Sequence, residues 1–118
     1  MGAQNQQSPH YWFNLSEVSV QGRRWFDGAN TYHAATVTLK TCVDGVPYDH
    51  VLQSDITYGY GHAYECTAMG LIREWLSSRL APIAMPSEGT SLHRWARYCQ
   101  VQVDSGYEDV RTKDALLS

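Results

Sequence analysis

The chain contains little of the positive charge that nucleic-acid binding requires. It has nine Lys and Arg residues against twelve Asp and Glu residues, which gives a formal net charge of −3. Binding through phosphate neutralisation needs clustered Lys and Arg side chains, and only Arg23–Arg24 and the pair Arg94 and Arg97 are locally basic. The charge balance therefore argues against nucleic acid as a partner.

Paired cysteines and long apolar runs are also absent. Cys42, Cys66 and Cys99 are odd in number and far apart, and the N-terminus lacks the basic and then apolar pattern of a signal peptide. This usage predicts a reducing, cytoplasmic location. The apolar runs are far shorter than the roughly 20 residues that cross a bilayer, so we expect no membrane partner.

The remaining composition is typical of one globular domain. Hydrophobic residues make up 43% of the 118, and a chain of this length buries roughly two-thirds of its unfolded surface, which is enough for a core. Residues 1–9 are polar and show no periodicity. This predicts a flexible N-terminal leader followed by a single α+β domain over residues 10–118.

Alternation of apolar and polar residues predicts three strands, over residues 10–21, 31–41 and 48–58. In the third strand the even positions carry most of the apolar surface, so these side chains are all expected on one face. The segment 22–30, with its Gly and Asn residues, is typical of a chain reversal, and Asp44-Gly45 indicates a tight hairpin turn.

After Gly61 the apolar period changes from two to about 3.6, which predicts one amphipathic helix that ends before Pro82. Gly70 lies inside this helix, where we expect it to mark a close approach of the helix to the sheet. Renewed alternation predicts a fourth strand within residues 92–106, and residues 107–118 suit a short helical turn or a frayed tail.

The predicted elements run β-β-β-α-β along the chain. The simplest arrangement is an antiparallel sheet with the amphipathic helix packed on one face, which is a two-layer α+β sandwich. One helix leaves the second face open, and Tyr32 and Tyr98 are expected there among Thr and Gln residues. This favours a homodimer through the open sheet face.

The corner between the third strand and the helix contains the segment Gly59-Tyr60-Gly61. These are the first two glycines of a dinucleotide fingerprint, but Tyr64 stands where the third glycine is needed, so a nucleotide loop is excluded. Two interpretations remain open. Either the corner is structural, with Tyr58, Tyr60 and Tyr64 at the core edge, or the helix N-terminus binds a protein or small-anion ligand.

The ligand-binding interpretation names a set of residues at this corner and at the start of the second strand. The set is Gly59, Tyr60, Gly61, His62, His33 and Tyr32. We expect His33 on the helix-covered face, hydrogen-bonded near the glycine corner. There is no CxxC or HExxH spacing, so we expect no metal, no cofactor and no catalytic residue.

Two alternatives come from other classes of protein. A small hydrolase or transferase would use a cluster of His33, His62 and Cys66, because a thiol near a helix N-terminus has a lowered pKa and an imidazole accepts its proton. A weak nucleic-acid binder would need its cations and a stacking ring on one exposed face. The residues concerned are Arg23, Arg24, Arg94, Arg97 and Trp95.

Four short motifs give the chain a family resemblance: Arg-Arg-Trp-Phe, Asn-Thr-Tyr-His, Tyr-Gly-Tyr-Gly and Thr-Ala, within residues 23–68. This series resembles small uncharacterised proteins of bacteria, phages and other mobile elements. The likeness spans Arg23 to about Leu76 and extends loosely to the segment 109–116. His62 departs from it, since an acidic residue is expected there. The resemblance implies a shared small domain and no particular activity, so we expect a binding or interaction protein, an accessory of a mobile element, and not an enzyme.

Overall fold

The computed structural model describes residues 14–79 and 90–117, which form a mixed α/β fold with one five-stranded sheet and two α-helices. The elements are β1 (Asn14–Phe26), β2 (Thr31–Val43), β3 (Val46–Gln53), β4 (Thr57–Tyr58), α1 (Ala63–Arg79), α2 (Leu92–Cys99), β5 (Gln102–Asp109) and the 3-10 turn η1 (Asp114–Leu117). The predicted leader over residues 1–9 and the predicted helix end before Pro82 lie outside the described residues.

Strands β1, β2 and β3 form the expected antiparallel meander. The strand β1 continues to Phe26, so the predicted reversal over residues 22–30 is shorter than expected. The turn lies at Asp27, whose carboxylate accepts hydrogen bonds from the backbone N–H groups of Ala29 (2.8 Å) and Asn30 (2.7 Å). This local cap closes the β1–β2 hairpin.

The prediction of a purely antiparallel sheet is wrong, because β5 pairs with β1 in parallel. The register aligns Val18 with Val103 and Arg24 with Asp109. The strand order is β3-β2-β1-β5, with β4 added beside β2. A parallel pair needs a long connection between its strands, and here the chain between β1 and β5 includes β2 to β4 and both helices.

The segment 92–99 is the helix α2 rather than the start of the fourth strand, so that prediction is also wrong. The Ser91 side chain accepts a hydrogen bond from the Arg94 N–H and caps the helix, and Gln100 ends it with a φ of 59°. Leu92, Trp95 and Ala96 are buried. Their i, i+3, i+4 spacing is the pattern of a helix. The sequence prediction missed it because the residues that follow alternate as in a strand.

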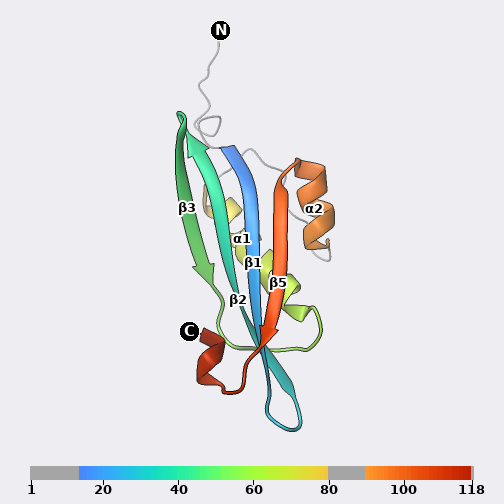
Figure 1. Cartoon of the computed structure of the whole chain (residues 1–118). Coiled ribbons are helices and arrows are strands. Elements are labelled where there is room, and N and C mark those ends of the chain that lie inside the picture. Colours follow the sequence, from blue (N-terminus) through green and yellow to red (C-terminus); the bar gives the residue numbers. More distant parts are fainter. Residues whose placement is uncertain (1–13, 80–89, 118) are drawn as a thin grey trace.

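Helix α1 packs against one face of the sheet, and α2 lies beside β5 (Figure 1). Together they bury a core that includes Val20, Leu39, Ile72 and Trp95. The close approach of α1 to the sheet occurs at Gly22, where a Cβ atom would lie 2.5 Å from the Tyr64 ring. It does not occur at Gly70, as predicted, since an added Cβ there would meet nothing within 4 Å.

The other face of the sheet carries mainly polar side chains, such as Ser19, Thr38 and Lys40. The turn η1 covers one end of it, where the buried Arg23 side chain donates a hydrogen bond from Nε to the Leu116 carbonyl (2.6 Å). Tyr98 was expected on this face but projects from α2. In the described part of the chain, no helix has the length and apolar character needed to cross a membrane.

Candidate functional site

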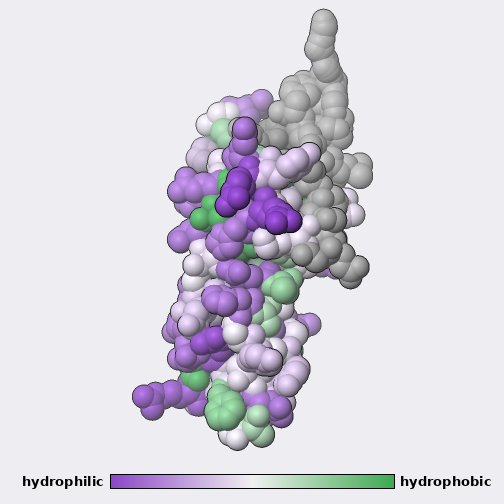
Figure 2. Space-filling model, turned by 90° about the vertical axis from the view of Figure 1, so that its right-hand side faces the viewer, coloured by the Kyte–Doolittle hydropathy of each residue, from purple (hydrophilic) through white to green (hydrophobic). Residues whose placement is uncertain are grey.

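Three of the sequence motifs meet at one end of the sheet. The register places Trp25 opposite Tyr32, and Tyr32 opposite Tyr58 on the short strand β4. We call the set Trp25, Phe26, Tyr32, Tyr58 and Tyr60 the aromatic end. Figure 2 views the molecule from the β5 side, and hydrophobic side chains gather at its lower end, where the β1–β2 hairpin lies in Figure 1.

Within the aromatic end, three rings form a continuous row across β1, β2 and β4. The centroids of Trp25 and Tyr32 are 6.0 Å apart, and those of Tyr32 and Tyr58 are 5.8 Å apart with the rings nearly perpendicular. These separations are within the range of favourable aromatic pairs. The row lines an open hollow of about 480 Å³, to which Asp27 and Lys113 add one charge of each sign.

Tyr58 reaches this row because the chain leaves the sheet between β3 and β4. The buried Ser54 side chain accepts a hydrogen bond from the Ala35 N–H (2.9 Å), and Ser54 N–H donates to the Ala35 carbonyl (2.9 Å). The interruption shifts the alternation, so Tyr48 shares the helix-covered face with its partner Thr41 whereas Tyr58 lies opposite Tyr32. The prediction that all even positions share one face is therefore wrong beyond this break.

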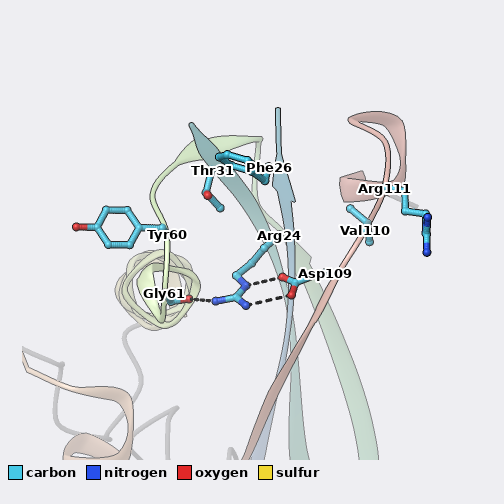
Figure 3. A pocket seen from close by; sticks show the side chains of 8 residues that line it. All are labelled: Arg24, Phe26, Thr31, Tyr60, Gly61, Asp109, Val110 and Arg111. Carbon is cyan, nitrogen blue, oxygen red and sulfur yellow. Dashed lines mark hydrogen bonds and ion pairs between the residues drawn. The ribbon is translucent and has the colours of Figure 1, made fainter. Parts of the chain in front are cut away.

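In the glycine corner that follows, Gly59 is tightly packed against its neighbours whereas Gly61 is open. Gly59 has a φ of 151°, and a Cβ atom there would lie 2.9 Å from the Ala63 Cβ and 3.1 Å from the His33 ring. Gly61 has a φ of 64° and no such neighbour within 4 Å. The side chain of Tyr60, between the two glycines, points away from Arg24 and Asp109 (Figure 3) and is 75% exposed.

The structural interpretation of the corner predicted that three tyrosines fill the core edge. Only Tyr64 does so, since it is buried against Gly22. Tyr58 and Tyr60 are 61% and 75% exposed. Two of the three rings therefore face solvent, and packing of the core does not explain them.

His33 is buried on the helix-covered face and bonds near the corner, as the sequence predicted. Its Nδ1 lies 3.1 Å from the Gly59 carbonyl and its Nε2 lies 2.6 Å from the Thr67 hydroxyl. A carbonyl only accepts, so Nδ1 carries the proton, and in the neutral ring Nε2 accepts from Thr67. The imidazole thus ties β2 to the corner and to α1.

Arg24, which lies on β1, links the glycine corner to β5. Its guanidinium donates from Nη1 to the Gly61 carbonyl (3.1 Å) and from Nε to Asp109 (2.8 Å), as Figure 3 shows. The same group lies 3.8 Å from the centroid of the Tyr107 ring. The hydrogen bond to Asp109 raises the pKa of Arg24 above its ordinary value, although burial opposes this.

A second hollow, of about 590 Å³, lies over this linkage. Phe26, Tyr60 and Arg111 are among its lining residues, and in Figure 3 Tyr60 and Arg111 project away from the Arg24 guanidinium. Sequence reasoning missed Arg24 and Asp109 as partners because they are 85 positions apart and no local pattern pairs them. Only their register across the parallel pair β1 and β5 brings them together.

The three residues of the hydrolase or transferase hypothesis occupy different environments. His33 is buried and bonded to Thr67, whereas His62 and Cys66 are exposed. The His62 ring packs against Tyr107, with centroids 6.0 Å apart. Across residues 14–79 and 90–117, no hydrogen bond joins the three side chains, and no group of three His, Cys, Asp or Glu residues is arranged to hold a metal ion.

The residues of the nucleic-acid hypothesis do not share one exposed face. Arg23 is buried and donates to the Leu116 carbonyl, and Trp95 is buried in the core. Arg94 and Arg97 are exposed on α2, which is a different element from the strand β1 that carries Arg23 and Arg24. The condition that we set for this hypothesis is therefore not met.

Comparison with known proteins adds no identity: no family model, no curated protein and no solved structure matches the chain.

Proposed function

We propose that this protein is a small binding protein that uses its aromatic end to contact another protein. The observation that carries the proposal is the exposure of three rings at one end of the molecule: Tyr58 (61%), Phe26 (63%) and Tyr60 (75%). Rings left in water contribute nothing to the core, and clustered exposed aromatic residues are typical of the centres of protein interfaces.

The rings also stand on a rigid support, which favours binding. Trp25 and Tyr32 are half-buried in the aromatic row, and the backbone of the corner is held by hydrogen bonds to His33 and Arg24. A surface fixed before binding loses little conformational entropy when the partner arrives. A protein partner suits this surface better than a small anion, because Arg24 already bonds to Asp109.

The biological setting is part of the same proposal. The motif series within residues 23–68 resembles proteins of phages and other mobile elements, and it supplies all five residues of the aromatic end. We therefore propose an accessory role in a mobile element. The absence of a disulfide among Cys42, Cys66 and Cys99 supports action in the reducing cytoplasm.

Site-specific photo-crosslinking tests the proposed surface. A photoreactive phenylalanine analogue replaces Tyr60 in one variant and Tyr98 in a second, which is a matched control because the two side chains are 75% and 76% exposed. In cells that carry the native gene, the Tyr60 variant should give one discrete heavier species, identified by mass spectrometry, and the Tyr98 variant should not. Equal products from both positions, or none from Tyr60, would contradict the proposal.

We also propose that the protein self-associates. The open sheet face, where we expected the homodimer, presents Ser19, Thr38 and Lys40 rather than a continuous apolar surface. Polar residues of this kind give little hydrophobic stabilisation to a dimer. The exposed edge strand β3 is a better candidate for the dimer interface.

A further inference from the structure

Strand β3 forms one edge of the sheet and has an unusual amount of exposed apolar surface. It is the outermost strand in Figure 1, and within the described residues it pairs only with β2. Its exposed apolar side chains are Val46 (49%), Tyr48 (49%) and Val51 (65%). An apolar edge strand with free backbone groups is a template for pairing with another chain.

The opposite edge of the sheet is protected in the manner usual for monomers. Strand β5 carries the exposed acids Asp104, Glu108 and Asp109, and this side of the molecule is largely hydrophilic in Figure 2. Strand β3 has a single charged residue, Asp49. Charged side chains on an edge discourage pairing, so the two edges differ in the property that decides association.

The β2–β3 turn determines which backbone groups of β3 point outward. Asp44 and Gly45 have φ angles of 51° and 81°, as in a two-residue hairpin turn, and Val43 pairs with Val46. In such a hairpin the closing pair is hydrogen-bonded and the pairs alternate from there. The backbone groups of the odd positions 47 to 53 therefore point away from β2. Pro47, which has no N–H, stands at one of these positions, as is usual for an edge proline.

We propose that β3 pairs antiparallel with β3 of a second copy of this chain, with the two-fold axis at Val51. In this register Val51 faces Val51 of the second copy, and Asp49 faces Gln53. Other positions of the two-fold axis are less favourable. An axis at Asp49 would place the Asp49 carboxylates of the two copies opposite each other. An axis at residue 52 would place Asp49 of one copy opposite Asp55 of the other. Like charges directly opposite are destabilising. A centre at residue 50 would put Pro47 in a hydrogen-bonded position opposite Gln53, with the loss of a backbone bond.

The helix-covered side of the same edge is shaped to receive the second copy. A shallow, mainly apolar hollow of about 220 Å³ lies beside β3 and is lined by Leu52, Leu71 and Trp75. In the proposed register Leu52 faces His50 of the second copy, so pairing covers this hollow on both chains. The interface would then combine backbone hydrogen bonds with burial of apolar side chains on both faces of the extended sheet.

The mass of the full-length protein gives the first test. Sedimentation equilibrium across a concentration series should show twice the chain mass of 13.3 kDa. Val51→Lys should reduce this to the single-chain mass, because it places two ammonium groups opposite each other at the axis. Val46→Lys is the matched control on the same strand, outside the paired segment, and should leave the dimer intact. A single-chain mass for the unaltered protein at every concentration overturns the inference.

Cysteine crosslinking tests the register. A hydrogen-bonded antiparallel pair holds Cα atoms about 5.5 Å apart, which permits a disulfide. Under oxidation Val51→Cys should form a covalent dimer that the unaltered protein does not form, and Gln53→Cys should not, because Gln53 faces Asp49. If Thr38→Cys on the open sheet face crosslinks instead, the interface is that face and the edge pairing is wrong.

Hydrogen exchange of the backbone amides completes the test. The amides of Asp49, Val51 and Gln53 should exchange slowly in the dimer and fast in the Val51→Lys variant. Slow exchange of these amides in a monomer would mean that another part of the same chain covers β3, which also overturns the inference. The inference rests on the self-association in the proposed function but not on the aromatic end, so photo-crosslinking at Tyr60 reports on that surface separately.

Discussion

Arg24 and Asp109 form a two-bond ion pair across the parallel strands β1 and β5, with Nε–Oδ1 and Nη2–Oδ2 distances of 2.8 Å and 3.3 Å. The same guanidinium also bonds the Gly61 carbonyl and lies over the Tyr107 ring. One cation therefore joins three segments that are remote in sequence. It bonds the glycine corner at Gly61, whereas His33, its partner across β1 and β2, bonds the corner at Gly59.

Asp109→Asn should destabilise the fold only slightly. The Asp109 side chain is largely exposed, and exposed ion pairs contribute about 0.2–1 kcal/mol to the free energy of unfolding. Urea denaturation of the variant, with Asp104→Asn on the same strand as control, measures this loss. High salt should shrink the difference, and an equal loss in the control would contradict the role of the pair. Arg24→Ala should cost more, since it also removes the bond to Gly61.

Gly22→Ala and Gly70→Ala should change stability in opposite directions. A Cβ at Gly22 would meet the Tyr64 ring at 2.5 Å, and overpacking of this kind costs about 1–3 kcal/mol. A Cβ at Gly70 meets nothing within 4 Å, and Ala in a helix is roughly 0.5–1 kcal/mol better than Gly. Thermal unfolding of both variants checks the pair. A destabilised Gly70→Ala would show that α1 approaches the sheet at that point after all.

Gly61→Val should destabilise the corner, whereas Gly61→Asn should be tolerated. Gly61 has a φ of 64°, and a left-handed conformation costs most side chains about 1–2 kcal/mol, with Asn less affected. Denaturation midpoints of the two variants give the measurement. If Gly61→Val retains full stability and loses only the Tyr60 crosslink, the position acts in binding and not in backbone geometry.

The stability of the β1–β2 hairpin should fall in acid because of Asp27. Backbone N–H groups of Asn30 and then Ala29 donate to its carboxylate and lower its pKa below the ordinary value of 3.8. The ionised form is therefore favoured in the folded state, so this contribution is complete above the ordinary value and is lost as pH falls through the lower folded value. Unfolding measured against pH should show this loss for the unaltered chain and not for Asp27→Asn. Asp44→Asn in the other hairpin turn is the control.

The candidate site was only partly predictable. The glycine corner and His33 were found from the sequence, because glycines between a strand and a helix and a histidine at a strand start are local signals. The exposure of Tyr58 was not, since it depends on the interruption at Ser54 that places Tyr58 opposite Tyr32. The partnership of Arg24 with Asp109 has no local signal at all.

Local patterns in the sequence were sufficient to predict the β1–β2–β3 meander with its Asp44-Gly45 turn, and α1, whose apolar residues repeat at the helical period. Tertiary packing determined that residues 92–99 form a helix, which buries Trp95 in the core. It also decided that β5 runs parallel to β1, which depends on the path of the whole connection between them. The periodicity of apolar residues predicts the type of an element and which of its faces is buried. The direction and neighbours of a strand depend on contacts between residues far apart in the chain.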